Sequence, residues 1–199
     1  ITAFKTRHGR TVYDGGGISP DVTLSERRYN PVCLSVVMGD YPFRYALSFL
    51  ESGKPMPLGA DGRMDDKAYA DFVSFMKSQP KFTYRTASQD AYERLVKMAK
   101  AEGLYDGAKD AIDALRAPMA ANIDRDMADA KDQVRPLVED EMIRAVKYRK
   151  AAIAHALQYD GQLKTAVDVL TDDARYVGLL NGTVASHAGD KRANLSKKK

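Results

Sequence analysis

The side chains that most often carry out chemistry are few in this sequence and lie far apart. Its histidines are His8, His155 and His187, and its single cysteine is Cys33. The histidines share no spacing typical of metal ligands, and no histidine can be placed beside Cys33 to activate it. We expect His155 to have a structural role on a helix face. Cys33 lies in an apolar run and is expected to be a small buried side chain.

Serines and lysines are plentiful, so a Ser–Lys dyad has to be considered. Such a dyad needs a serine in a strained turn and a lysine whose pKa is lowered by desolvation. Ser35 is the only serine within an apolar stretch, residues 32–38, and no lysine can be assigned to it. The sequence therefore predicts no catalytic residue, no cofactor-binding residue, no cofactor and no metal ligand in this chain.

Glycine-rich and acidic stretches raise two further possibilities. Gly15-Gly16-Gly17 could cradle a phosphate, but neither a Lys-Ser/Thr pair nor a helix follows it directly. Asp61, Asp65 and Asp66 lack the alternating spacing and the closing glutamate of a calcium loop. The remaining acidic positions are expected on solvated helix faces. They are Asp124, Asp126, Asp129, Asp132 and the run Glu139-Asp140-Glu141.

Composition is that of an ordinary globular chain. Of its 199 residues 44% are hydrophobic and 29% charged, which is enough apolar material for a core. No apolar run is long enough to cross a membrane, and no signal peptide is expected. The net charge of +4 comes partly from lysines at 197–199. The internal basic cluster at 147–150 is interpreted as a solvated helix face, so we expect no nucleic-acid partner.

The first twenty residues carry the strongest local pattern. Two alternating runs flank His8-Gly9, which predicts a β-hairpin with Gly9 at positive φ in the turn. The three glycines allow the backbone to bend sharply or to lie close against another surface. Ser19-Pro20-Asp21 then predicts a turn, because proline favours an extended residue before it.

This ordered pattern resembles one family. Gly9-Arg10, the run Gly15 to Ile18 and Pro20-Asp21-Val22 resemble the end of the catalytic domain in carboxyl-terminal processing peptidases, the tail-specific serine proteases. The resemblance covers roughly a tenth of the chain strongly. The helical remainder resembles the tail of the same group in its order of helices and in a few positions. These are Asp160, Tyr176 and the pair Leu179-Leu180.

The resemblance implies that the active site lies elsewhere in the parent protein. In that family the nucleophilic serine and the lysine base precede the Gly-Gly-Ile-x-Pro-Asp segment. The family's nucleophile motif has no match in this chain, so it is expected to be a C-terminal fragment without catalytic residues. Similar proteases lie in the periplasm or elsewhere outside the cytoplasm. They act on protein C-termini, and several use helical regions to dimerise or to hold an adaptor or substrate.

Helix start and stop signals divide the rest of the chain. Asn30, Asp40, Asp65, Thr86 or Ser88, Asp160, and Thr171 or Asp172 are expected to cap helices. The longest pattern runs from Ile123 to Leu157 with an apolar face of nine residues. These are Ile123, Met127, Ala130, Val134, Val138, Met142, Ala145, Ile153 and Leu157. Pro136 predicts a kink near Asp132 or a break with Pro136 in the first turn of a second helix.

These signals predict a mainly α fold, an irregular bundle of about six or seven helices with a short N-terminal β-hairpin. Residues 1–28 are predicted to be the last hairpin and connector of the protease domain. Residues 29–185 are the helical domain, and 186–199 are a basic, disordered tail. We expect the helical domain to bind protein or peptide, or a second copy of itself, through apolar positions around 138–157. The alternative is a stand-alone helical protein-binding module.

Overall fold

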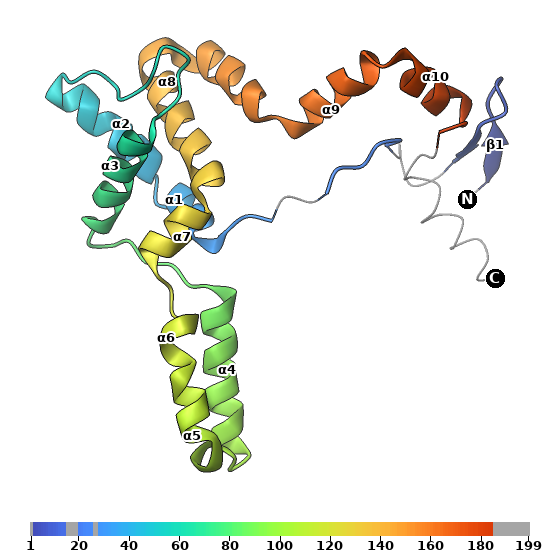
Figure 1. The fold of residues 1–199 in the computed structure, drawn as a ribbon. Coiled ribbons are helices and arrows are strands. Elements are labelled where there is room, and N and C mark those ends of the chain that lie inside the picture. Colours follow the sequence, from blue (N-terminus) through green and yellow to red (C-terminus); the bar gives the residue numbers. More distant parts are fainter. Residues whose placement is uncertain (1, 15–19, 26–27, 185–199) are drawn as a thin grey trace. The chain divides into compact units, whose positions relative to one another are not determined.

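The structure is a computed structural model, and it describes residues 2–14, 20–25 and 28–184 (Figure 1). The predicted glycine run, His187 and the basic tail lie outside the described residues. The chain forms two compact units. The first comprises Ile1–Arg27 and Asp160–Lys199, and the second comprises Arg28–Tyr159. The described part is mainly helical with one short hairpin, as predicted, but it contains ten α-helices rather than six or seven.

The first unit contains the predicted hairpin and the last two helices. Strand β1 (Ala3–Lys5) pairs antiparallel with β2 (Thr11–Tyr13), with Phe4 opposite Val12. The prediction for Gly9 is confirmed, because it adopts φ 82° in the turn. Helices α9 (Gly161–Leu170) and α10 (Asp173–Asn181) complete the unit. Arg10 links the hairpin to α10, because its guanidinium donates to the Leu179 carbonyl at 3.1 Å and pairs with Asp21.

The second unit contains eight α-helices. They are α1 (Pro31–Met38), α2 (Tyr41–Ser52), α3 (Asp66–Lys77), α4 (Ala87–Ala101), α5 (Tyr105–Ala114), α6 (Arg116–Met119), α7 (Ile123–Asp129) and α8 (Lys131–Ala156). A short 3₁₀ turn, Leu157–Tyr159, follows α8. Helices α1, α2, α3, α7 and α8 surround the core, and α2 packs most extensively against α8. This group is called the core bundle below.

Most predicted helix caps are confirmed. Asn30, Asp65, Thr86, Asp160 and Asp172 each accept a hydrogen bond from a backbone N–H in the first turn of the following helix. These bonds satisfy amide groups that have no partner within the helix itself. The prediction for Asp40 is wrong. Asp40 adopts the left-handed conformation with φ 53°, and its side chain makes no capping bond.

The core bundle buries a chain of aromatic and sulfur-containing side chains. Phe72 and Met76 of α3 are fully buried, and the Tyr45 ring of α2 packs edge-on against Phe72 at 5.1 Å between centroids. The helical spacing of Ala68, Phe72, Phe75 and Met76 predicts an inward face on α3, and their burial confirms it. On α2 the helical spacing of Phe43, Ala46, Leu47 and Leu50 predicts one apolar inward face, and this prediction is partly wrong. Ala46 is buried, whereas a stripe of larger apolar residues is exposed, namely Phe43, Leu47 and Leu50. Tyr41 and Tyr45 occupy the core on this helix instead.

The long apolar pattern divides into three helical segments. The first break lies at Ala130, between α7 and α8, two residues before the expected kink at Asp132. Pro136 lies in the second turn of α8 rather than in its first. A second break, at Tyr148, has φ 64° and ψ 178° and was not predicted. The apolar face is buried up to Met142, but Ile153 and Leu157, beyond this break, are exposed.

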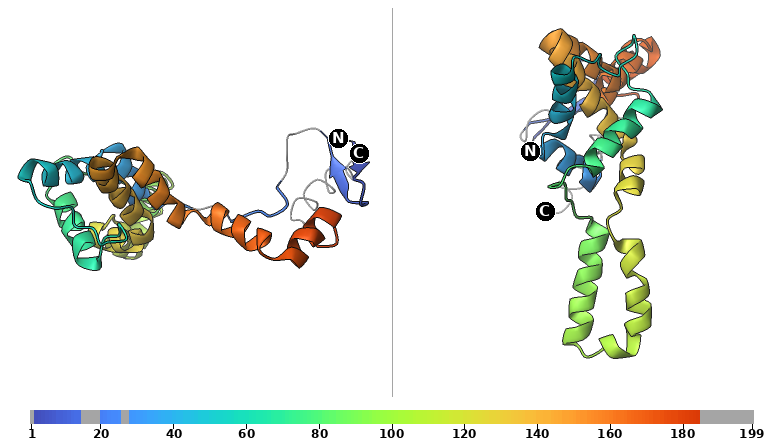
Figure 2. Two further views of the ribbon diagram at one scale, coloured as in Figure 1. Left: turned by 90° about the horizontal axis from the view of Figure 1, so that it is seen from above. Right: turned by 90° about the vertical axis from the view of Figure 1, so that its left-hand side faces the viewer.

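Helices α4, α5 and α6 form a separate helical hairpin within the second unit. Helix α4 runs antiparallel to α5 and α6 and packs against both, as Figure 1 and the right-hand view of Figure 2 show. Gly103 permits the turn, because its φ of 71° suits glycine. This element is called the α4–α6 hairpin below. It buries only Ala99 and Ile112, so its interior is much thinner than that of the core bundle.

Candidate functional site

The described part of the chain contains one buried group of ionisable side chains that resembles a catalytic arrangement. Glu139 of α8 is fully buried, and its Oε2 lies 2.9 Å from His155 Nε2. The Tyr159 hydroxyl donates to the same oxygen at 2.7 Å. The other oxygen, Oε1, accepts the Met64 backbone N–H at 2.8 Å. Glu139, His155, Tyr159 and the Met64 amide are called the Glu139 cluster below.

The cluster exists because the chain reverses at Tyr148. Glu139 and His155 are sixteen residues apart, and a straight helix would separate them by about 24 Å. The reversal at Tyr148 brings the last turns of α8 back against the first part of the same helix. Gly62 fits closely against the returning segment, since a Cβ added there would lie 3.1 Å from His155 Nδ1. The spacing of the residues in sequence therefore gave no sign that they meet.

The Glu139 cluster is built to hold structure together rather than to react with a substrate. Carboxylate, imidazole and phenol could exchange protons, but Glu139 has no exposed surface through which a substrate could reach it. Burial and the hydrogen bond to Glu139 raise the pKa of Tyr159 to about 12, so its hydroxyl stays protonated as a donor. The prediction that Glu139 lies on a solvated face is wrong, because the reversal of α8 covers it.

A second cluster of polar residues stabilises the base of the α4–α6 hairpin, where its two ends join the core bundle. Asp126 is 5% exposed and accepts hydrogen bonds from the Tyr84 hydroxyl at 2.7 Å and from the Asn122 backbone N–H at 3.1 Å. Tyr84 precedes α4 and Asn122 follows α6, so one carboxylate holds both connections of the hairpin. Arg125 pairs with the same carboxylate at 2.9 Å. The expectation of a solvated Asp126 is therefore also wrong.

The ionisation of Asp126 follows from these contacts. Burial opposes the charge, but hydrogen bonds from Tyr84, Arg125 and the Asn122 backbone outweigh it and lower the pKa of the carboxyl. Burial, reinforced by the bond to Asp126, raises the pKa of Tyr84. The charged carboxylate and the neutral phenol therefore form a stable pair, and neither is poised to transfer a proton near neutral pH.

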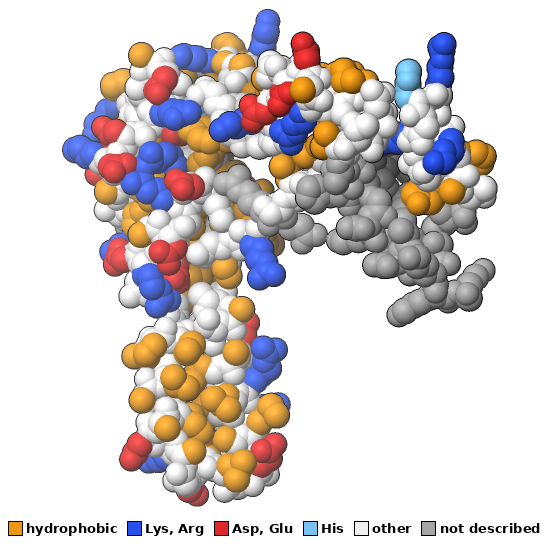
Figure 3. Space-filling view, turned by 45° about the vertical axis from the view of Figure 1, so that its right-hand side comes forward, with side chains coloured by type: hydrophobic (Ala, Val, Ile, Leu, Met, Phe, Trp, Pro, Cys, Tyr) orange, Lys and Arg blue, Asp and Glu red, His pale blue; other side chains and the backbone are white. Residues whose placement is uncertain are grey.

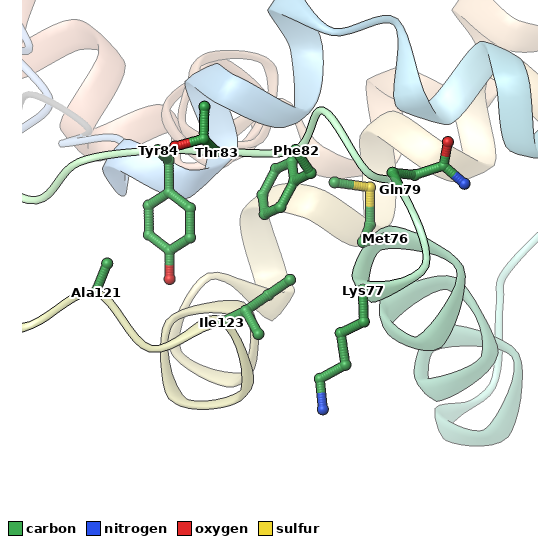
Figure 4. Close-up of a pocket in the computed structure, with 8 residues that line it drawn as sticks. All are labelled: Met76, Lys77, Gln79, Phe82, Thr83, Tyr84, Ala121 and Ile123. Atoms are coloured by element: carbon green, nitrogen blue, oxygen red, sulfur yellow. The ribbon is translucent and has the colours of Figure 1, made fainter.

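An open pocket of about 360 Å³ lies near this base, between the end of α3 and the start of α7 (Figure 4). Met76, Phe82 and Ile123 supply apolar lining, while Lys77 and Gln79 supply polar groups. Lys77 already pairs with Asp124, so its charge is partly neutralised. Polar and apolar groups are mixed in this lining, so the pocket favours no one class of ligand.

The largest accumulation of exposed apolar side chains in the Figure 3 view covers the α4–α6 hairpin. Leu95 and Met98 of α4 are exposed, as are Leu104 at the turn and Leu115 after α5. Helical spacing with neighbouring apolar residues predicts inward positions for Leu95 and Leu115, and this prediction is wrong. Two helices alone cannot surround both sets of side chains, so one face of the hairpin remains open to solvent.

The other residues considered as reactive groups are dispersed. Cys33 is buried in the core, and Ser35 lies on the same short helix α1. Asp65 caps α3, and Asp66 pairs with Lys131 and Arg135. Within the described ranges no three His, Cys, Asp or Glu side chains are grouped in a way that could hold a metal ion. None of the helices described there has the length and apolarity needed to cross a lipid bilayer.

Comparison with known proteins gives one match. A family model described as "Probable PDZ-protease, C-terminal helical domain" matches residues 34–170, more than half of the chain. The matched range runs from α1 to the end of α9 and includes the Glu139 cluster and the α4–α6 hairpin. Neither the curated proteins nor the solved structures contain a match.

Proposed function

This chain belongs to the family of probable PDZ-protease C-terminal helical domains, and from this premise we propose that it is a non-catalytic, protein-binding region of a carboxyl-terminal processing serine endopeptidase. The parent protein would cleave near protein C-termini with a Ser/Lys dyad upstream of this chain. The helical region would bind substrate tails or an adaptor, or would dimerise. Its location would be periplasmic or otherwise outside the cytoplasm, as in similar proteases.

The family match over residues 34–170 is the observation that carries this proposal. The geometry is consistent with a binding role. The Glu139 cluster is closed to substrates, whereas apolar side chains on α2 and on the α4–α6 hairpin are open to solvent. Large exposed apolar patches are characteristic of protein-interaction surfaces. The serine type, the compartment and the partner rest on the resemblance of the first twenty residues to processing peptidases.

A peptidase assay on an unfolded model protein tests the proposal. This chain should not cleave, whereas the parent chain extended upstream should, and substitution of its upstream serine by alanine should abolish cleavage. Deleting residues 29–185 from the parent should weaken binding of the model protein, which is measured separately with the serine-to-alanine variant. Cleavage by this chain alone would overturn the proposal. Binding by this chain without any protease activity in the parent would favour the stand-alone module.

A further inference from the structure

The α4–α6 hairpin lacks the packing that helices of its length require. Most of the stability of short helices in proteins comes from tertiary contacts along an apolar face. In this hairpin only Ala99 and Ile112 are buried, while two larger side chains of α4, Leu95 and Met98, are exposed. The hairpin therefore carries more apolar surface than its own two-helix interior can cover.

The exposed apolar side chains lie on one face of the hairpin. In α4, Ala91, Leu95 and Met98 follow the i, i+4, i+7 spacing of a helical stripe. A second stripe follows α5 and its two ends, and it consists of Leu104, Ala111 and Leu115. Because the helices are antiparallel and share the interior at Ala99 and Ile112, both stripes fall on the same side. Figure 3 shows apolar side chains gathered across the hairpin in this way. These six residues are called the hairpin face below.

The charges of the hairpin are suited to pairing with an identical hairpin. Between residues 85 and 119 there are six basic and six acidic side chains, so two copies would not repel each other. Arg94 lies on α4 opposite the interior position Ala99, and Asp110 lies on α5 opposite Ile112. Both are therefore at outer edges. Both are exposed, and neither has an ion-pair partner within the described part of the chain.

We propose that the hairpin face binds the same face of a second copy of this chain, forming an antiparallel four-helix arrangement. A two-fold axis parallel to the helices would place α4 of one copy over α5 of the other. Arg94 of each copy would then lie beside Asp110 of the other, and the leucines and Met98 would be buried between the hairpins. This inference specifies the self-association part of the proposed function, but its test does not depend on proteolysis.

Sedimentation analysis of the 199-residue chain and of two matched variants tests the face. The wild-type chain should be dimeric at about 100 µM. Leu95→Glu places a charge in the hairpin face and should raise the dimer Kd about tenfold or more. Lys100→Glu places a glutamate on the side of α4 opposite that face, where Lys100 is exposed, and should leave the Kd unchanged. Circular dichroism of both variants should match the wild type, which separates lost association from lost folding.

Charge reversal tests the pairing geometry. Arg94→Asp and Asp110→Arg should each weaken the homodimer. An equimolar mixture of the two variants should form the heterodimer preferentially, because both of its edge pairs are then attractive. A monomeric wild-type chain, or equal effects of Leu95→Glu and Lys100→Glu, would overturn the proposal. If the chain dimerises as proposed but the parent protein shows no peptidase activity, the result would count against the proposed function and not against the dimer.

Discussion

Tyr159 shows how a single hydroxyl joins separate parts of the second unit. It donates to Glu139 at 2.7 Å, and its ring lies 5.3 Å beneath the Arg63 guanidinium. Arg63 also donates to Gln158 at 3.2 Å, so the loop before α3 is held against the 3₁₀ turn that follows α8. Glu139 is satisfied on both oxygens, as a buried carboxylate must be. Tyr159 therefore stabilises the fold in its protonated form, as a hydrogen-bond donor.

The raised pKa of Tyr159, about 12, predicts a loss of stability at alkaline pH. An unfolded tyrosine ionises near pH 10. The stabilisation that the hydroxyl adds to the free energy of unfolding should thus be fully present below about pH 10. It should be lost as the pH rises from about 10 to about 12. Tyr159→Phe should lower the free energy of unfolding at pH 7 by about 1–3 kcal/mol, because Glu139 loses a donor.

The measurement is urea unfolding between pH 7 and pH 11.5. Other buried tyrosines, such as Tyr45 with a pKa also raised to about 12, contribute to the change in the free energy of unfolding with pH. The informative quantity is therefore the difference in this pH dependence between variant and wild type. Tyr159→Phe should show the shallower pH dependence. Tyr148→Phe removes an exposed hydroxyl and serves as the control, with the wild-type slope. Identical slopes for all three proteins would contradict the prediction.

Among the elements, α8 is the one whose backbone departs furthest from its local pattern. Tyr148 adopts φ 64° and ψ 178°, a region populated almost only by glycine. Its side chain is 79% exposed, so no packing at that position compensates for the strain. The returning segment instead supplies the compensation, through buried Ala152 and the pair between His155 and Glu139. The reversal is thus held by contacts on either side of it.

Tyr148→Gly should stabilise the second unit. Glycine adopts the observed conformation without strain, and the exposed ring makes little contribution, so we expect a gain of about 1 kcal/mol after the entropy cost of glycine. Thermal and urea unfolding of the whole chain measure it. Arg149→Gly, at the next exposed position, should instead destabilise by about 1 kcal/mol. Equal destabilisation by both variants would show that position 148 is an ordinary helical residue.

At the scale of the whole molecule, the two compact units differ in how they are built. The second unit, Arg28–Tyr159, contains the core bundle with its fully buried Phe72, Met142 and Val138. In the first unit few described side chains are buried, and α9 buries none. Because a contiguous apolar core is what makes a domain fold independently, the second unit has the means to fold without the first.

A chain of residues 28–159 should therefore fold alone. We expect cooperative urea unfolding and a near-ultraviolet circular dichroism spectrum that reports packed tyrosines. Phe72→Ala in this shortened chain should reduce stability by about 3–5 kcal/mol, as expected for a fully buried aromatic ring. A gradual transition insensitive to Phe72→Ala would show that the core bundle needs the remaining residues.

Local sequence determined the elements and most of their ends. Caps such as Asn30, Asp65 and Thr86 act within one helical turn, and Gly9 acts within a four-residue turn, so neighbouring residues alone were sufficient to predict them. The mainly α character followed from the same local patterns. So did the resemblance to processing peptidases, which rests on short ordered motifs.

Tertiary structure decided which side of each helix is buried and which distant residues meet. An apolar stripe such as Leu95 and Met98 predicts a face but not whether that face has a partner in the same chain. Glu139 was expected in solvent because its neighbours Asp140 and Glu141 are charged, yet the reversal at Tyr148 covers it with His155 and Tyr159. Burial depends on contacts between residues far apart in the sequence, and helical periodicity contains no information about them.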